Sequence, residues 1–148
     1  MYQRVLVPVD GSQTSELALR EAVRLASDQK AELRIIYVLE DIVPLWEVEL
    51  LNINEIRHAV RETGKRFLKK AETAARAGGV KVQTALVEAS PPGARAATMI
   101  VEEAKAWPAD LIVIGTHGRR GVDHLLMGSV AEGVVRISPA PVLLLRSK

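Results

Sequence analysis

The sequence predicts an α/β fold with a parallel sheet at its centre. The chain contains five short runs rich in Val, Ile and Leu, and the first, residues 4–9, lacks polar alternation, which is typical of a strand buried on both faces. Four segments with apolar residues at helical spacing alternate with these runs, as amphipathic helices do. Strict alternation implies right-handed crossovers and helices on both faces of the sheet. We therefore expect one domain, residues 1–148, with a five-stranded Rossmann-like sheet in the order 3-2-1-4-5.

Turn residues help to place the strands. Pro8 has no amide proton, so it should lie at the end of the first strand, and an Asp-Gly-Ser turn at 10–12 follows it. The last run is very apolar, so at a sheet edge it would need to be covered. We expect a homodimer joined through 141–146, with coverage by the chain's own helices as the alternative. The strands are expected at 4–9, 32–39, 80–88, 110–114 and 141–146.

The expected helices differ greatly in length. They span 14–28, 54–77, a segment from Pro91 or Pro92 to about 106, and 129–137. Gly64 weakens the longest one by up to ~1 kcal/mol relative to alanine, and Gly78-Gly79 supplies a left-handed stop. Residues 40–54 follow no clear period, so we expect a loop with one turn of helix there. The apolar stripe expected on the longest helix is Ile56, Val60, Thr63, Phe67, Ala71 and Ala74.

Composition excludes several classes of function. The 148 residues carry a net charge of only +2, which is too mild to indicate a nucleic-acid or membrane partner. Aromatic residues are 3% of the chain, so a base-stacking RNA platform is excluded. The absence of cysteine excludes disulfides and thiolate metal sites. No leader-like segment and no run near the ~18 residues of a membrane span is present, so we expect a cytoplasmic protein.

The most informative stretch is 115–129, which lies between the fourth strand and the last helix. Gly115, Gly118, Gly121 and Gly128 allow main-chain amides to approach a ligand without obstruction by Cβ atoms. Arg119 and Arg120 add positive charge, and Ser129 is expected as the N-cap of a helix whose start attracts anions. The stretch therefore suits a phosphate group, although a tight turn alone explains many glycine-rich loops.

A second loop should converge on the same place. In doubly wound sheets, ligands bind beyond the carboxyl ends of the strands where the strand order reverses, here between the first and fourth strands. Asp10 follows the first strand, and Gly115 to Gly118 follow the fourth. Asp10 either orients a polar group or a hydrated metal ion, or serves as a turn residue.

Other chemistries find little support in the sequence. It contains no Walker loop, no dinucleotide fingerprint after the first strand and no Gly-x-Ser-x-Gly elbow. His58, His117 and His124 do not fall at metal-ligand spacing with carboxylates. For His117 a structural hydrogen bond is favoured over acid–base chemistry, and no catalytic residue is assigned.

The whole chain resembles the universal stress proteins. The resemblance rests on the opening segment 5–12, on 109–118, on 126–132 and on 140–144. Members that bind ATP carry Gly-x2-Gly-x9-Gly followed by Ser or Thr, and this chain has Gly115, Gly118, Gly128 and Ser129 in that register. The resemblance thus implies a small α/β protein of the ATP-binding subgroup.

The resemblance also implies where each part of an adenine nucleotide lies. The adenine would lie against Val9, Asp10 and Val38 with Pro8 beneath it, and the ribose near Gly115 and its neighbours. A Thr is common two places after the motif's Ser, but this chain has Ala131, which leaves the choice among ATP, ADP and AMP open. The remaining expected binding residues are Thr116, His117, Gly118, Arg119, Arg120, Gly121, Gly128, Ser129, Val130 and Ala131.

Three functions stay open at this point. The first is a nucleotide-binding regulator of the stress response that acts as a homodimer. The second is a slow ATP hydrolase that uses Asp10, Mg²⁺ or Mn²⁺ and a residue of the phosphate loop. The third is a protein-interaction module that no longer binds nucleotide. The complete glycine pattern counts against the third, and the lack of a convincing general base counts against the second.

Overall fold

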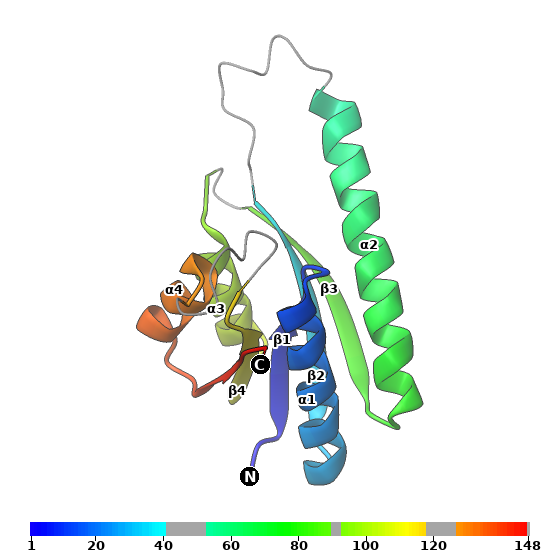
Figure 1. The fold of residues 1–148 in the computed structure, drawn as a ribbon, viewed down its shortest axis with the longest axis vertical. Helices are drawn as coiled ribbons and strands as arrows, with labels where there is room; N and C mark the ends of the chain where they lie inside the picture. Colours follow the sequence, from blue (N-terminus) through cyan, green and yellow to red (C-terminus); the bar gives the residue numbers. More distant parts are fainter. Residues whose placement is uncertain (41–52, 90–92, 118–126, 148) are drawn as a thin grey trace.

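The strands form one parallel sheet in the order β3-β2-β1-β4-β5, as the sequence predicts. The computed structural model describes residues 1–40, 53–89, 93–117 and 127–147 (Figure 1). The first strand is a short apolar segment, and Pro8 ends it, where its missing amide proton costs no ladder bond. The strands are β1 (Arg4–Pro8), β2 (Glu32–Leu39), β3 (Val82–Glu88), β4 (Leu111–Gly115) and β5 (Val142–Leu145).

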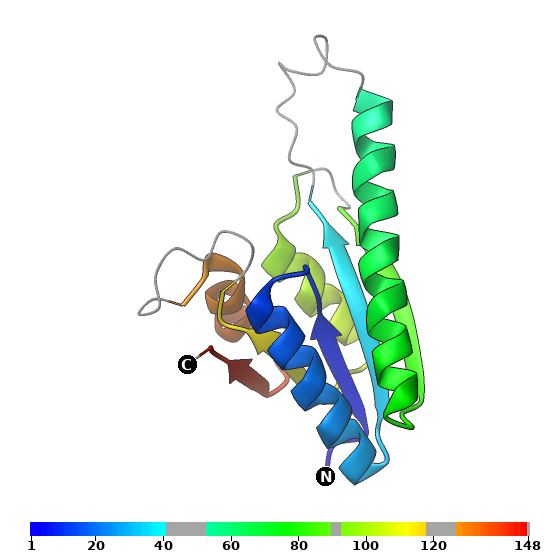
Figure 2. The same ribbon diagram turned by 45° about the vertical axis from the view of Figure 1, so that its right-hand side comes forward.

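Helices cover both faces of the sheet, which therefore has two cores. On one face lie α1 (Gln13–Gln29) and α2 (Ile53–Ala77), and on the other lie α3 (Ala96–Ala106) and α4 (Ser129–Ile137) (Figure 2). Alternation along β1 divides the two cores, because successive side chains of a strand point to opposite faces. Val5 and Val7 pack with Ala18 and Ala22 of α1. Leu6 packs with Ile100 and Val134 of α3 and α4, among other residues.

The buried stripe of α2 differs from the expected one by about one residue. Gly64, Leu68, Ala71 and Ala75 are buried, whereas Ala74 is exposed, so that part of the prediction is wrong. The cause is a close approach of the helix to the sheet at Gly64. A Cβ atom there would lie 2.7 Å from Cδ1 of Tyr37 and 2.9 Å from Cδ1 of Leu86. The glycine that lowers helix propensity thus lets the helix backbone pack directly on two side chains.

The ends of the helices confirm some predictions and correct others. Gly79 has φ +74° after α2, as expected of a left-handed stop. The expectation that Pro91 or Pro92 opens the third helix is wrong, because α3 begins at Ala96. The amide of Ala96 donates instead to the Glu40 carboxylate, 2.7 Å away. Of the expected loop at 40–54, residues 41–52 lie outside the described part, and α2 already begins at Ile53.

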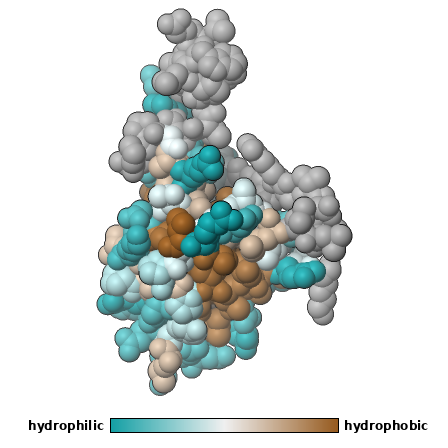
Figure 3. All heavy atoms as spheres, turned by 90° about the vertical axis from the view of Figure 1, so that its left-hand side faces the viewer, coloured by the Kyte–Doolittle hydropathy of each residue, from teal (hydrophilic) through white to brown (hydrophobic). Residues whose placement is uncertain are grey.

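Strand β5 lies at the edge of the sheet beside β4, as predicted. Its Leu143 is 36% exposed, and the neighbouring helix α4 leaves Val135 and Ile137 44% and 46% exposed. Figure 3 views the side on which α4 lies in Figure 1, and apolar surface gathers there. In the described part of the chain, no helix is both long and apolar enough to cross a membrane.

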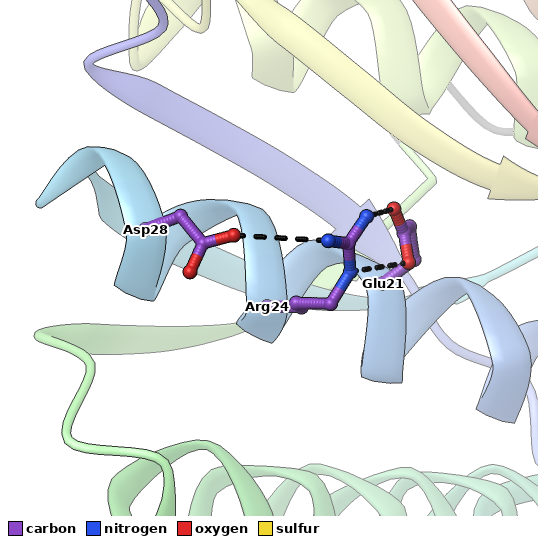
Figure 4. A network of polar contacts seen from close by, with 3 residues as sticks. All are labelled: Glu21, Arg24 and Asp28. Carbon is purple, nitrogen blue, oxygen red and sulfur yellow. Dashed lines mark hydrogen bonds and ion pairs between the residues drawn. The ribbon is translucent and has the colours of Figure 1, made fainter.

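The outer face of α1 carries a small network of charges (Figure 4). The Arg24 guanidinium lies 2.5 Å from Glu21 and 3.7 Å from Asp28, one helical turn away on either side. Hydrogen bonding from Arg24 holds the pKa of Glu21 below its ordinary value. Because Arg24 is largely exposed, solvent screens the pair, and we expect it to contribute little to stability.

Candidate functional site

The site lies where the strand order reverses between β1 and β4. These strands pair only at Val5–Leu111 and Leu6–Ile112, whereas the β4–β5 ladder continues to Gly115–Leu145. Pairing between β1 and β4 therefore stops before either strand ends. The loops that follow the two strands meet beyond this point, as ligand-binding loops do in doubly wound sheets.

The loop after β1 is a tight turn centred on Asp10. Its Oδ1 accepts a 2.8 Å hydrogen bond from the Ser12 amide, and its own amide donates to Oγ of Ser15. Gly11 has φ +82°, and a Cβ atom there would lie 2.5 Å from Cζ of Phe67. Ser12 then caps α1 by accepting from the Ser15 amide. The turn role that the sequence allowed for Asp10 is therefore present.

The loop after β4 packs against the first turn of α1. A Cβ atom on Gly115 would lie 2.6 Å from Oγ1 of Thr14 and 2.7 Å from its carbonyl carbon. The hydroxyl of Thr14 donates to the carbonyl of His117, which Ser12 Oγ also approaches at 3.5 Å. The two loops are thus fastened to each other through side chains of α1.

His117 forms a hydrogen bond with its neighbour Thr116. Its Nδ1 lies 3.0 Å from Oγ1 of Thr116, and its Nε2 is buried without a hydrogen-bond partner within the described ranges. The Thr116 amide donates to the Leu145 carbonyl at 2.8 Å, so this loop is also tied to the end of β5.

The start of α4 has main-chain amides with no acceptor among the described residues. Gly128 is the N-cap residue and has no side chain to cap the helix, while its amide donates to the Thr116 carbonyl at 2.6 Å. Ser129 is the first helical residue, so the prediction that it is the N-cap is wrong. The amides of Ser129, Val130 and Ala131 have no acceptor in the described part of the chain. Together with the positive end of the helix dipole, such amides suit an anion.

Gly128 is needed for a reason other than its backbone angles. Its φ of −63° and ψ of 156° are open to any residue. A Cβ atom, however, would lie 2.9 Å from the Thr116 carbonyl oxygen. Glycine therefore allows the end of the loop to close on the segment that follows β4.

The structure brings most of the predicted residues to one edge of the sheet. Pro8, Val9 and Val38 lie at the carboxyl ends of β1 and β2, and the Val9 amide donates to the Ile36 carbonyl at 2.8 Å. No group of three or more His, Cys, Asp or Glu residues that would hold a metal ion occurs among the described residues. Four predicted binding residues lie outside the described part: Gly118, Arg119, Arg120 and Gly121.

Sequence reasoning missed three polar residues near these loops. Thr14 and Ser15 look like ordinary residues of a helix start, although the Thr14 hydroxyl bonds His117 far along the chain and Ser15 accepts from the Asp10 amide. Glu40 follows β2 and caps α3 across 56 positions of sequence. One sequence signal could have revealed Thr14 and Ser15. It is the presence of hydroxyl residues in the first turn of the helix that follows Asp10.

Comparison with known proteins settles the family. The model of the universal stress protein family matches residues 1–146. The chain belongs to the universal stress protein family. It is 36% identical to the universal stress protein MJ0531 of Methanocaldococcus jannaschii, covering 99% of this chain and 83% of that protein. It is 35% identical to YxiE of Bacillus subtilis, covering 99% and 100%.

Solved structures of universal stress proteins share the fold. One from Burkholderia pseudomallei has a TM-score of 0.80 at 32% identity, covering 99% of this chain and 97% of that one. A universal stress protein in complex with cAMP has a TM-score of 0.72 at 27% identity, covering 99% of each chain. One from Archaeoglobus fulgidus in complex with dAMP has a TM-score of 0.69 at 25% identity, covering 97% and 98%.

Proposed function

We propose that this universal stress protein binds an adenine nucleotide at the β1–β4 switch point and acts in the stress response. The observation that carries the proposal is the start of α4, whose first amides have no acceptor in the described part of the chain and lie beside the loops after β1 and β4. Two related structures are complexes with cAMP and with dAMP, and both ligands contain adenine and a phosphate group. The shared chemistry is therefore an adenine nucleoside, with ribose or deoxyribose, that carries at least one phosphate.

In this proposal the adenine and the ribose take the places that the family resemblance implies, and the phosphates lie at the start of α4. The phosphates accept hydrogen bonds from the amides of Ser129, Val130 and Ala131, and the Ser129 hydroxyl is exposed and available. The Gly128 amide is already bound to Thr116, so Gly128 shapes the site instead of donating to phosphate. The adenine lies against Val9, Asp10 and Val38, and the ribose lies near Gly115. Any Mg²⁺ or Mn²⁺ that accompanies the nucleotide would reach Asp10 through water.

We also propose that two copies pair through β5. The strand lies at the sheet edge, and the apolar side chains of Leu143, Val135 and Ile137 are partly exposed beside it. A second copy that covers them would remove both the open edge and the apolar surface from water. The Thr116 amide bonds the Leu145 carbonyl, so an interface at β5 would lie beside the loop that follows β4.

Calorimetric titration tests the nucleotide proposal. The purified protein is titrated with ATP, ADP, AMP, adenosine and GTP, and mass spectrometry identifies any small molecule that co-purifies with it. We expect adenine nucleotides to bind one per chain and adenosine to bind more weakly, because it lacks the phosphate. A Gly128→Val variant should lose this preference for phosphate. Failure of every adenine nucleotide to bind the ligand-free protein would contradict the proposal and would favour an interaction module.

A further inference from the structure

The buried polar side chains of the described residues gather at one place. They are Thr14, Ser15 and Thr116, with relative exposures of 5%, 6% and 8%. Two belong to the first turn of α1, and the third follows β4. Burying a hydroxyl costs free energy unless it forms a hydrogen bond, so each of these side chains needs a specific partner.

The partner of Thr14 is the main-chain carbonyl of His117, the residue after Thr116. Thr14 Oγ1 donates to the His117 carbonyl across 103 positions of sequence. Ser12 Oγ lies 3.5 Å from the same oxygen and is also engaged as the N-cap of α1. Thr14 is therefore the main side-chain contact that sets the direction of this carbonyl.

The surrounding packing leaves little freedom for another arrangement. Gly115 lies so close to Thr14 that a Cβ atom would approach Oγ1, Cβ and the carbonyl carbon of Thr14 within 2.8 Å. Thr116 is held on its other side by Leu145 and Gly128 through main-chain hydrogen bonds. The segment 115–117 is therefore fixed between α1, β5 and the start of α4.

Direct contact between the Thr14 hydroxyl and a ligand is disfavoured. The hydroxyl has a single proton, and it is already donated to His117. The residue is also almost fully buried. The Thr14 hydroxyl can then affect the affinity for a ligand only by fixing the position of the loop that follows β4.

We propose that Thr14 is a positioning residue for the nucleotide site. It fixes the His117 peptide, and through it the spacing between the Asp10 turn, the β4 loop and the α4 amides. The inference rests on the proposed nucleotide binding. It adds that the affinity depends on a hydroxyl group that does not touch the nucleotide.

Three variants test this inference. Thr14→Val keeps the shape and removes the hydroxyl, Thr14→Ser keeps the hydroxyl, and Thr73→Val removes a helical hydroxyl that bonds only its own helix, to Lys69. Titration with ATP and AMP should show about three- to tenfold weaker binding for Thr14→Val, the range that one buried hydrogen bond supplies. Thr14→Ser should restore most of the affinity, and Thr73→Val should leave it unchanged. The amide NMR signals of Thr116 and His117 should shift in Thr14→Val alone.

Contrary outcomes separate this inference from the function itself. If the folded Thr14→Val variant binds the nucleotide with the affinity of the wild type, the positioning role is overturned and the proposal of nucleotide binding still stands. Loss of affinity in Thr14→Ser equal to that in Thr14→Val would also overturn it, because a hydroxyl group at this position would then not be enough to hold the site. If Thr14→Val does not fold, Thr14→Ala serves the same comparison without a branched side chain. A wild-type protein that binds no adenine nucleotide would overturn both proposals.

Discussion

Replacing Gly115 with alanine should damage the nucleotide site and the fold together. The added Cβ atom would lie 2.6 to 2.8 Å from three atoms of Thr14, one of them a backbone carbon. Carbon atoms in contact normally stand ~3.5–4.0 Å apart, so β4 and α1 must separate by about 1 Å. Overpacking of this kind typically costs ~1–3 kcal/mol. The same movement pulls the Thr14 hydroxyl away from His117.

Gly79→Ala provides the matched control. Its Cβ atom would meet nothing within 4 Å, but its φ of +74° strains an alanine by ~1 kcal/mol. Both variants should therefore lower the free energy of unfolding in urea, followed by circular dichroism, by comparable amounts. Only Gly115→Ala should also weaken ATP binding, by about tenfold or more if the loops part by the expected distance. Wild-type affinity in Gly115→Ala would refute the claim that this close contact shapes the site.

Other predictions concern positions away from the proposed contacts with the nucleotide. Asp110→Ala should cost ~1.5–3 kcal/mol of unfolding free energy with unchanged nucleotide binding, because its carboxylate accepts from two main-chain amides at the start of β1 at 2.8 and 3.0 Å. Glu21→Gln should lower stability by no more than ~0.5 kcal/mol above pH 5. Arg24 lowers the pKa of Glu21 in the folded state, so the Glu21 carboxylate stabilises the fold at pH values above its unfolded-state pKa. The difference in unfolding free energy between wild type and Glu21→Gln should vanish as the pH falls through the folded-state pKa of Glu21. Leu143→Lys should give monomers in sedimentation, and a variant that stays dimeric would disprove pairing through β5.

The sequence predicts the strand order because its signals are local and repeated. Buried strands, helical spacing and the glycine stop at Gly79 each follow from short stretches, and the usual strand order of doubly wound sheets then arranges them. The position of the site follows in turn from that order, since the loops after β1 and β4 must meet. Only general rules were needed for these steps.

Features that depend on a distant neighbour were missed. The hydrophobic spacing on α2 is compatible with two slightly different rotations of the helix about its axis. Which of the two faces the sheet depends on Tyr37 and Leu86, whose side chains lie against Gly64. The capping of α3 by Glu40 and the bond from Thr14 to His117 join residues far apart in sequence. Such contacts leave no periodic pattern, so the sequence alone does not reveal them.

The central claim is that main-chain amides at the start of α4 hold the phosphate of an adenine nucleotide. An NMR titration of uniformly ¹⁵N-labelled protein with AMP, and separately with adenosine, observes these amides directly. We predict that AMP shifts the amide signals of Ser129, Val130 and Ala131 strongly and that adenosine leaves them nearly unmoved. Saturation with AMP while these three signals stay in place would contradict the account.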